Sequence, residues 1–362
     1  MKRRSAELLF LLAGAALLAA CDHTAPLEYE PPEALPPASD ELPLRLTFSS
    51  GADRGPAVSG GVLAYSRVDE APGSRDRCIG LMPTQGGTLL AILCPPPRTE
   101  QKDSVTTWVE PVVSPDGTRI AYVHQKSSLE AVLGTGRHFH VAPLDDLTAL
   151  EFRWMPFLIL PDGRTMDALM KPSWRDSTTI RFLAARDFIP KVKGGGAERF
   201  TDTTLIALAL MEVDLVTGEV AVVPGADSAI AYAPAPDGGT WIVTLSDRTR
   251  LLHQAQGSSG WVEVGTFLGE VLDLASVDGL AMAVLTDSAT IEGLVPETGE
   301  HVPLAWCPPT WVKLPNCSSG SGRPAWVLRV AGVPGTRTFV AEIEMPIDSF
   351  GGSANLWLLE LP

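Results

Sequence analysis

Short apolar segments separated by turn residues fill the chain from about residue 44 onward. In the clearest unit, residues 110–122, an apolar segment leads into Ser114-Pro115-Asp116-Gly117 and an alternating segment follows at 120–123. Proline presets φ at a turn, aspartate hydrogen-bonds to the nearby backbone, and glycine tolerates a positive φ. The pattern therefore predicts a tight hairpin between two strands. Almost no helical periodicity follows residue 20, which predicts an all-β body.

The same unit recurs in weaker forms along the chain. Its predicted turns lie near residues 60, 116, 176, 237, 278 and 320. A base period of about 40 residues suits a four-stranded repeat such as a propeller blade, and the longer gaps leave room for loops. Further strand pairs are predicted around glycine turns, for example at Thr217-Gly218. The repeats predict six blades, while the weakness of the last two leaves seven, or five with a cap, as alternatives.

The unit Pro-x-Val-Ser-Pro-Asp-Gly-x-x-Ile-Ala-Tyr at residues 111–122 resembles the repeat of TolB-type six-bladed β-propellers. Residues 46–56 also resemble that family's inter-blade strand. The resemblance covers residues 44–362 and implies an all-β fold, a six-bladed β-propeller of four-stranded antiparallel blades. It further implies that the N-terminal strand at 44–48 pairs with a strand at 355–361 and closes the ring, which would hide sheet edges.

Residues 1–20 predict a signal peptide. A basic head at residues 2–4 is followed by an apolar run at 8–20, with small residues immediately before Cys21. This arrangement resembles the lipobox of bacterial lipoproteins, which implies cleavage before Cys21 and attachment of lipid to that cysteine. The alternatives are an ordinary cleaved signal peptide and a transmembrane anchor, although the run is shorter than the roughly 20 residues that span a bilayer. We therefore expect a lipid-anchored, extracytoplasmic protein of the bacterial cell envelope, with the choice of membrane open.

Proline and acidic residues dominate residues 21–43, which predicts an extended, disordered tether before the propeller domain at 44–362. The chain carries a net charge of −15. An acidic body repels phosphate backbones, so we expect no nucleic-acid partner. We expect a monomer.

Four cysteines remain after Cys21, and they form two local pairs, Cys78 with Cys94 and Cys307 with Cys317. An even number of cysteines in an exported protein predicts disulfides. Three pairings are open, and closeness in sequence favours the local one. Neither pair has the Cys-x-x-Cys spacing typical of redox or metal sites.

Motifs for catalysis are lacking. The sequence contains no Gly-x-Ser-x-Gly elbow, no His-Glu-x-x-His helix and no Walker loop, and only two asparagines could serve as calcium ligands. We therefore predict no catalytic residue, no metal, no other cofactor and no enzyme. The alternative is a metal-dependent hydrolase or lactonase-like enzyme with its site in the central channel. His138 and His140 would share one face of a strand, as a metal pair would, but a solvated edge strand is the preferred interpretation.

The predicted function is a protein-interaction module that binds an envelope partner through propeller-face loops, as TolB-type relatives do. The predicted loops are at residues 95–108, 125–137, 151–161 and 186–201. One of them carries the candidate partner-binding residues Phe152, Trp154, Met155 and Phe157. An outer strand packed on its neighbour is the alternative interpretation of these residues, and a sensor of a small ligand or peptide is the alternative function.

Overall fold

The computed structural model of the chain describes residues 42, 44–47, 52–68, 76–96, 104–128, 136–154, 158–159, 165–166, 169–189, 205–286, 291–304, 326–345 and 353–361. Residues 1–41, which include the predicted signal peptide, Cys21 and most of the predicted tether, lie outside this part. Within the described residues, no helix has the length and apolar character needed to cross a membrane.

Four separate sheets contain four strands each, and neighbouring strands in them are antiparallel. One consists of β12 (Leu169–Trp174), β13 (Thr179–Ile189), β14 (Leu205–Asp214) and β15 (Glu219–Val222). The next consists of β16 (Ala229–Pro234), β17 (Thr240–Thr244), β18 (Arg250–Gln254) and β19 (Val262–Thr266). The third consists of β20 (Val271–Val277), β21 (Leu280–Leu285), β22 (Ile291–Val295) and β23 (Glu300–Leu304). The fourth consists of β1 (Leu44–Arg45), β26 (Ser353–Glu360), β25 (Thr338–Met345) and β24 (Trp326–Gly332).

An eight-stranded sheet completes the body. Its first half is β2 (Arg54–Ser59), β3 (Val62–Val68), β4 (Arg77–Pro83) and β5 (Ala91–Leu93). Its second half is β6 (Ser104–Val113), β7 (Arg119–Ser128), β8 (Gly136–Pro143) and β9 (Phe152–Trp154). Both halves are antiparallel, and one parallel pair, Arg77 with Thr107, joins β4 to β6. A short pair, β10 (Leu158–Ile159) and β11 (Thr165–Met166), stands apart.

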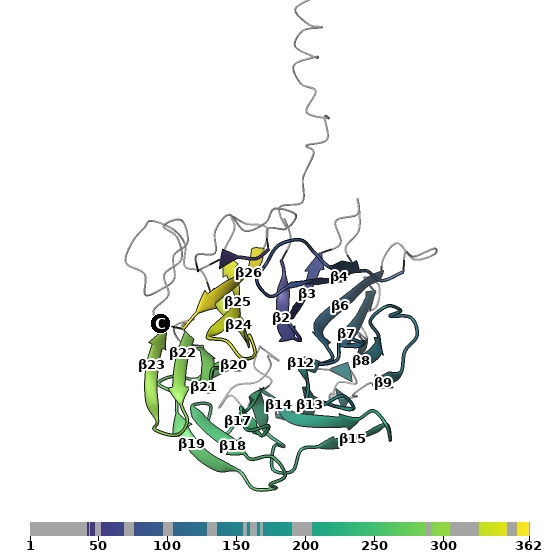
Figure 1. Ribbon diagram of the computed structural model, residues 1–362. Coiled ribbons are helices and arrows are strands. Elements are labelled where there is room, and N and C mark those ends of the chain that lie inside the picture. Colours follow the sequence, from purple (N-terminus) through teal and green to yellow (C-terminus); the bar gives the residue numbers. More distant parts are fainter. Residues whose placement is uncertain are drawn as a thin grey trace, which may run out of the picture.

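The sheets surround a common centre, with β2, β12, β20 and β24 nearest to it and β15, β19 and β23 at the rim (Figure 1). The fold is therefore an all-β propeller of four-stranded antiparallel blades, as predicted. The prediction of six separate blades is confirmed only in part. Four separate four-stranded sheets are present beside the eight-stranded sheet, because the pairing of β4 with β6 merges two halves into one sheet.

Strand β1 completes the sheet formed by the last three strands, so the two ends of the described body meet. Leu44 pairs with Leu358, and the Leu46 amide donates to the Leu356 carbonyl at 2.8 Å. The hydroxyl of Thr47, which is fully buried, accepts from the Leu356 amide at 3.0 Å. Pairing these edge groups satisfies backbone donors and acceptors that would otherwise be exposed or unpaired.

The turn residues behave as the sequence predicts. Asp116 accepts from the Thr118 amide at 3.1 Å, and Gly117 has a φ of +72°. Asp237 accepts from the Gly239 amide at 2.9 Å in an equivalent turn. Both aspartates are therefore turn formers. The turn between β24 and β25 lies at Gly335, and the sixth predicted turn, near residue 320, lies outside the described residues.

The core lies between neighbouring sheets, where alternate side chains of facing strands interdigitate. One cluster joins β20 and β21 to β24, β25 and β26 through Met282, Phe339 and Trp357, each at most 2% exposed. A second joins β16 and β17 to β20 and β21 through Trp241 and Leu274. The burial of these apolar faces stabilises the ring, at about 25 cal/mol per Å² removed from water.

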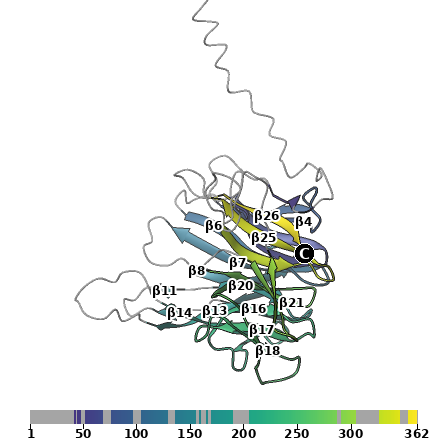
Figure 2. The same cartoon turned by 90° about the vertical axis from the view of Figure 1, so that its left-hand side faces the viewer.

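The antiparallel order gives the ring two different faces. Turns between the first and second strands, and between the third and fourth strands, of each four-strand unit lie on one face, here called the turn face. Strands β5, β7, β9 and β13 all end on the opposite face, here called the connection face. Figure 2 shows the ring from the side, with the strands running between the two faces. The four predicted loops all adjoin these strand ends, but the prediction is wrong for the parts of them that form strands. These parts are residues 104–108, 125–128, 136–137, 152–154, 158–159 and 186–189, which belong to β6, β7, β8, β9, β10 and β13.

Candidate functional site

Three inner strands carry the same irregularity near the centre of the ring. Gly55, Glu110 and Lys171 each precede a proline at a shift in the strand register, in β2, β6 and β12. Their φ angles are +63°, +53° and +50°. The left-handed region is easy for glycine but costs about 1–3 kcal/mol for other residues, so the surrounding contacts must hold Glu110 and Lys171 in place.

Those contacts form an axial cluster of four side chains from four inner strands: Glu110, Lys171, Asp273 and Arg329. Arg329 Nη1 donates to Glu110 Oε2 at 2.7 Å, and the Lys171 amide donates to the same oxygen at 3.1 Å. Lys171 Nζ lies 2.6 Å from Asp273 Oδ1 and also donates to the Leu274 carbonyl. The cluster therefore joins β6, β12, β20 and β24 through charge-assisted hydrogen bonds, which are stronger than neutral ones.

Burial sets the ionisation of this region. It lowers the pKa of Lys171, although the neighbouring Asp273 carboxylate opposes the shift. On β25, Glu342 is 2% exposed and accepts from the Gly55 amide at 2.9 Å. Burial raises the pKa of Glu342 to about 7, against the opposing charge of Arg329. The centre of the ring thus contains a carboxyl group that titrates near neutral pH.

The space beside the axial cluster is small. A cavity of about 20 Å³ is lined by the three register-shift residues, by Asp273 and by Arg329. That volume holds about one water molecule. The described residues therefore bring charged groups together on the axis as an inter-blade lock, without room there for an organic substrate.

A larger recess lies beside the turn face, between two sheets. This groove has a volume of about 520 Å³ and is lined by β13, β14 and β15 on one side and by the turns at 238–239 and 254–259 on the other. Glu212 on its floor accepts from Arg181 Nε at 2.7 Å and from Arg175 Nη1 at 3.1 Å. Asp214 and Glu219 also line the groove, so two arginines stand beside three carboxylates and the lining carries both signs of charge.

The candidate partner-binding aromatics are partly used for packing. Phe152 contacts Phe139 with ring centroids 6.3 Å apart, and Trp154 contacts Phe182 at 5.3 Å. Both side chains are half-buried against the core between β8 and β13. Their packing matches the alternative interpretation of an outer strand set on its neighbour. Met155 and Phe157 lie outside the described residues.

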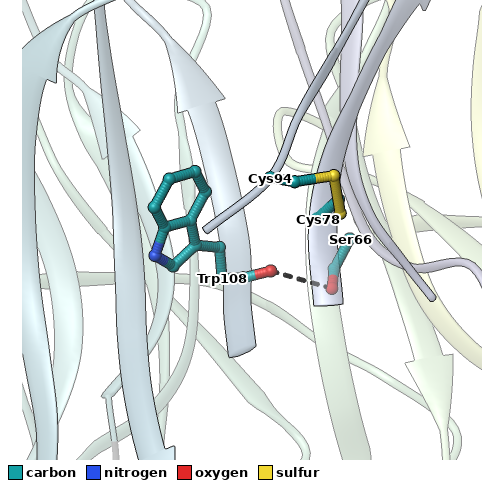
Figure 3. The surroundings of a disulfide bond; sticks show 4 residues. All are labelled: Ser66, Cys78, Cys94 and Trp108. Carbon is teal, nitrogen blue, oxygen red and sulfur yellow. Dashed lines mark hydrogen bonds between the residues drawn. A yellow bond between two sulfur atoms is a disulfide. The ribbon is translucent and has the colours of Figure 1, made fainter. Parts of the chain in front are cut away.

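Cys78 and Cys94 form a disulfide, as the local pairing predicts. Figure 3 shows the bond beside Trp108, whose carbonyl accepts from the Ser66 hydroxyl at 3.0 Å. The bridge holds the end of β5 against β4, close to the connection face. The other predicted sites on cysteine, Cys21, Cys307 and Cys317, lie outside the described residues.

The edge-strand interpretation of His138 and His140 is wrong. Strand β8 pairs with β7 on one side and with β9 on the other, and His140 is only 5% exposed. Sequence reasoning also missed the axial cluster. The sequence does contain a signal for this cluster, namely a proline within each of three predicted strands, since proline marks a break in strand pairing. These prolines follow Gly55, Glu110 and Lys171.

No protein-family model matches the chain, and no curated protein matches it. Among solved structures, a puromycin hydrolase matches with a TM-score of 0.45 and 15% identity, covering 86% of this chain and 52% of that one. A protein provisionally named a gluconolactonase gives 0.44 and 13%, covering 87% and 90%. The β-propeller domain of the Trilobed protease from Pyrococcus furiosus gives 0.41 and 12%, covering 87% and 97%. The identities and scores are too low to carry an argument about function.

These matches nevertheless correct one prediction. The sequence predicted a protein that is not an enzyme, yet the structures with a similar propeller include a hydrolase and a domain of a protease. The prediction of a non-enzyme, which rested on missing motifs, is therefore contradicted, because propellers of this kind occur in enzymes as well as in binding proteins.

Proposed function

We propose that this chain is a lipid-anchored, extracytoplasmic β-propeller that binds a protein partner of the bacterial envelope through the connection face. One observation carries the proposal: the ends of β5, β7, β9 and β13, which bound all four predicted loops, lie on the same face. Loops set side by side on a rigid scaffold form a continuous recognition surface. Partner binding needs such a surface and needs no deep cavity.

The anchoring and the repeat architecture belong to the same proposal. Residues 1–20 would be removed, Cys21 would carry lipid, and the tether up to residue 43 would hold the propeller away from the bilayer. We infer six blades by counting the two antiparallel halves of the eight-stranded sheet as one blade each. That count, the closure by β1 and the Ser-Pro-Asp-Gly unit support a TolB-type propeller.

Cross-linking followed by affinity purification of the full-length lipoprotein from its native envelope tests the proposal. Two exposed β-branched side chains offer a matched pair of variants. Ile92, 49% exposed, lies on β5 next to the strand end that bounds the first loop, and Val216, 78% exposed, lies in the β14–β15 turn on the turn face. A charge at the centre of an interface disrupts it, whereas a charge on a free surface has little effect.

We expect one recurrent envelope protein with the native chain and with Val216→Asp. We expect its loss with Ile92→Asp, and with a variant in which residues 190–204 are replaced by a short Gly-Ser linker. Recovery of the same partner with all variants would show that the connection face does not bind it. A Cys21→Ser chain separates partner binding from membrane attachment.

The groove beside the turn face supports a second function, the sensing of a small ligand. Its 520 Å³ falls in the range typical of small-molecule sites, and a lining of arginines and carboxylates suits a zwitterionic ligand. A thermal-shift screen with small zwitterions such as free amino acids tests this function. A stabilising ligand should lose its effect on Arg175→Ala, whose side chain is one-third exposed.

A further inference from the structure

Three histidines from two adjacent strands gather on one side of the eight-stranded sheet. His124 on β7 stands directly opposite His138 on β8, and His140 lies two residues further along β8. Side chains two residues apart share a face of a strand, so all three rings project to the same side. The ring centroids of His124 and His140 are 5.0 Å apart, those of His138 and His140 are 5.9 Å apart, and those of His124 and His138 are 6.3 Å apart.

The buried member of this group presents an unpaired nitrogen. His140 Nδ1 lies 3.3 Å from the Tyr122 hydroxyl, and that hydroxyl donates its proton to the Leu147 carbonyl at 3.4 Å. With the Tyr122 hydroxyl donating to Leu147, Nδ1 of His140 is the donor in this pair and the lone pair is on Nε2. The His140 residue is only 5% exposed, and its Nε2 has no hydrogen-bond partner among the described residues. An imidazole with one nitrogen fixed by a hydrogen bond and the other open is the usual state of a metal ligand.

His124 and His138 are only half-buried, so water reaches this side of the group.

The spacing of the rings suits a single ion. With Zn–N bonds of 2.0–2.1 Å, imidazoles around a tetrahedral zinc ion have ring centroids roughly 5 Å apart. The His124–His140 pair already has this separation, and the other two pairs exceed it by about 1 Å. The described residues include no group of three ligands already converged on a point. Rotation of the half-buried His138 ring would bring the third nitrogen in.

Arg153 on β9 opposes this rotation. Its Nε donates to His138 Nδ1 at 3.0 Å, and its Nη2 lies 3.5 Å from His138 Nε2, so the rotation must break both contacts. Arg153 also stands opposite His140 in the β8–β9 pairing. The guanidinium therefore occupies one lone pair of the group and repels a cation. Because Arg153 is exposed, it can swing into solvent when an ion arrives.

We propose that His124, His138 and His140 form a three-histidine site for a divalent transition-metal ion such as Zn²⁺, with Arg153 displaced when the ion binds. Imidazole ligands suit zinc, copper and nickel, and three protein ligands leave a fourth position for water or another ligand. The site is separate from the connection-face proposal, because neither its residues nor its chemistry enters that argument.

Titration of the purified full-length protein in detergent with Zn²⁺, followed by calorimetry, tests the site. Co²⁺ in place of Zn²⁺ gives a visible absorption band that reports tetrahedral coordination. We expect one ion per chain with a micromolar or tighter Kd, and loss of at least 30-fold in affinity with His124→Ala or His138→Ala. These two residues are half-buried, so their variants should fold, which far-ultraviolet circular dichroism would verify.

Two further variants sharpen the result. Arg153→Ala removes the competing cation and should tighten Zn²⁺ binding about tenfold, an effect that random surface binding would not show. His253→Ala changes a histidine paired with Asp237 on the turn face and should leave the affinity unchanged. Absence of binding to the native chain at 100 µM Zn²⁺, roughly the weak end of useful metal sites, would overturn the proposal. So would an affinity that His124→Ala and His138→Ala leave intact.

Discussion

Replacing Glu342 with glutamine should stabilise the protein at pH 8 but not at pH 4. Burial raises the pKa of this carboxyl from 4.5 to about 7 in the folded protein. Between pH 4.5 and about pH 7, the Glu342 carboxyl keeps in the folded state a proton that it has lost in the unfolded state. The free energy of unfolding therefore falls as pH rises through this window, by about 1.4 kcal/mol per unit and about 3 kcal/mol in all. Glutamine is neutral throughout and can still accept from the Gly55 amide.

Urea denaturation at pH 4, 6 and 8, followed by tryptophan fluorescence, measures the effect. The quantity to compare is the free energy of unfolding of Glu342→Gln minus that of the native chain at each pH, because other titrating groups cancel in the difference. We expect this difference to grow by about 3 kcal/mol from pH 4 to pH 8. Glu344→Gln is the matched control on the same strand, since it changes a more exposed carboxylate paired with Arg54. A difference that stays constant with pH would refute the reasoning about burial.

Three other substitutions probe different parts of the ring. Lys171→Met leaves Asp273 buried without its ion partner and should lower the free energy of unfolding by about 3 kcal/mol, whereas an unchanged urea midpoint would mean that the pair contributes nothing. Cys94→Ser opens a disulfide between residues 16 apart and should cost about 2–3 kcal/mol. The native chain treated with reductant should show at least the same fall in Tm, because reductant also opens the predicted Cys307–Cys317 bridge. Gly332→Ala places a Cβ 1.8 Å from the Ser276 carbonyl oxygen, so we expect at least about 3 kcal/mol of destabilisation or failure to fold, measured as soluble yield and Tm.

Local chemistry made part of the fold predictable. The hairpin at Ser114-Pro115-Asp116-Gly117 follows from residues that shape their own turn, and Asp116 and Gly117 adopt the expected contacts and φ. The hairpin at Gly335, between β24 and β25, shows the limit of such chemistry, because the repeat pattern does not predict it. The predicted turn near residue 320 lies outside the described residues.

The candidate sites depended on contacts across the ring. Arg329 meets Glu110 although 219 positions separate them, and no periodicity in the sequence places them together. Likewise, His138 and His140 were recognised as a pair on one strand, but only the register between β7 and β8 brings His124 beside them. Register depends on turn geometry and on which face is buried, so it becomes definite only when neighbouring strands are in place.

The sequence by itself determined an all-β repeat of turns and strands, the local Cys78–Cys94 bridge and the N-terminal closing strand, because each rests on short-range chemistry or on a recognisable repeat. The tertiary structure decided which charged residues meet on the axis, which strand ends share the connection face and how deeply His140 is buried. These properties arise when the sheets pack around a common centre, where desolvation and long-range pairing act on residues far apart in the chain.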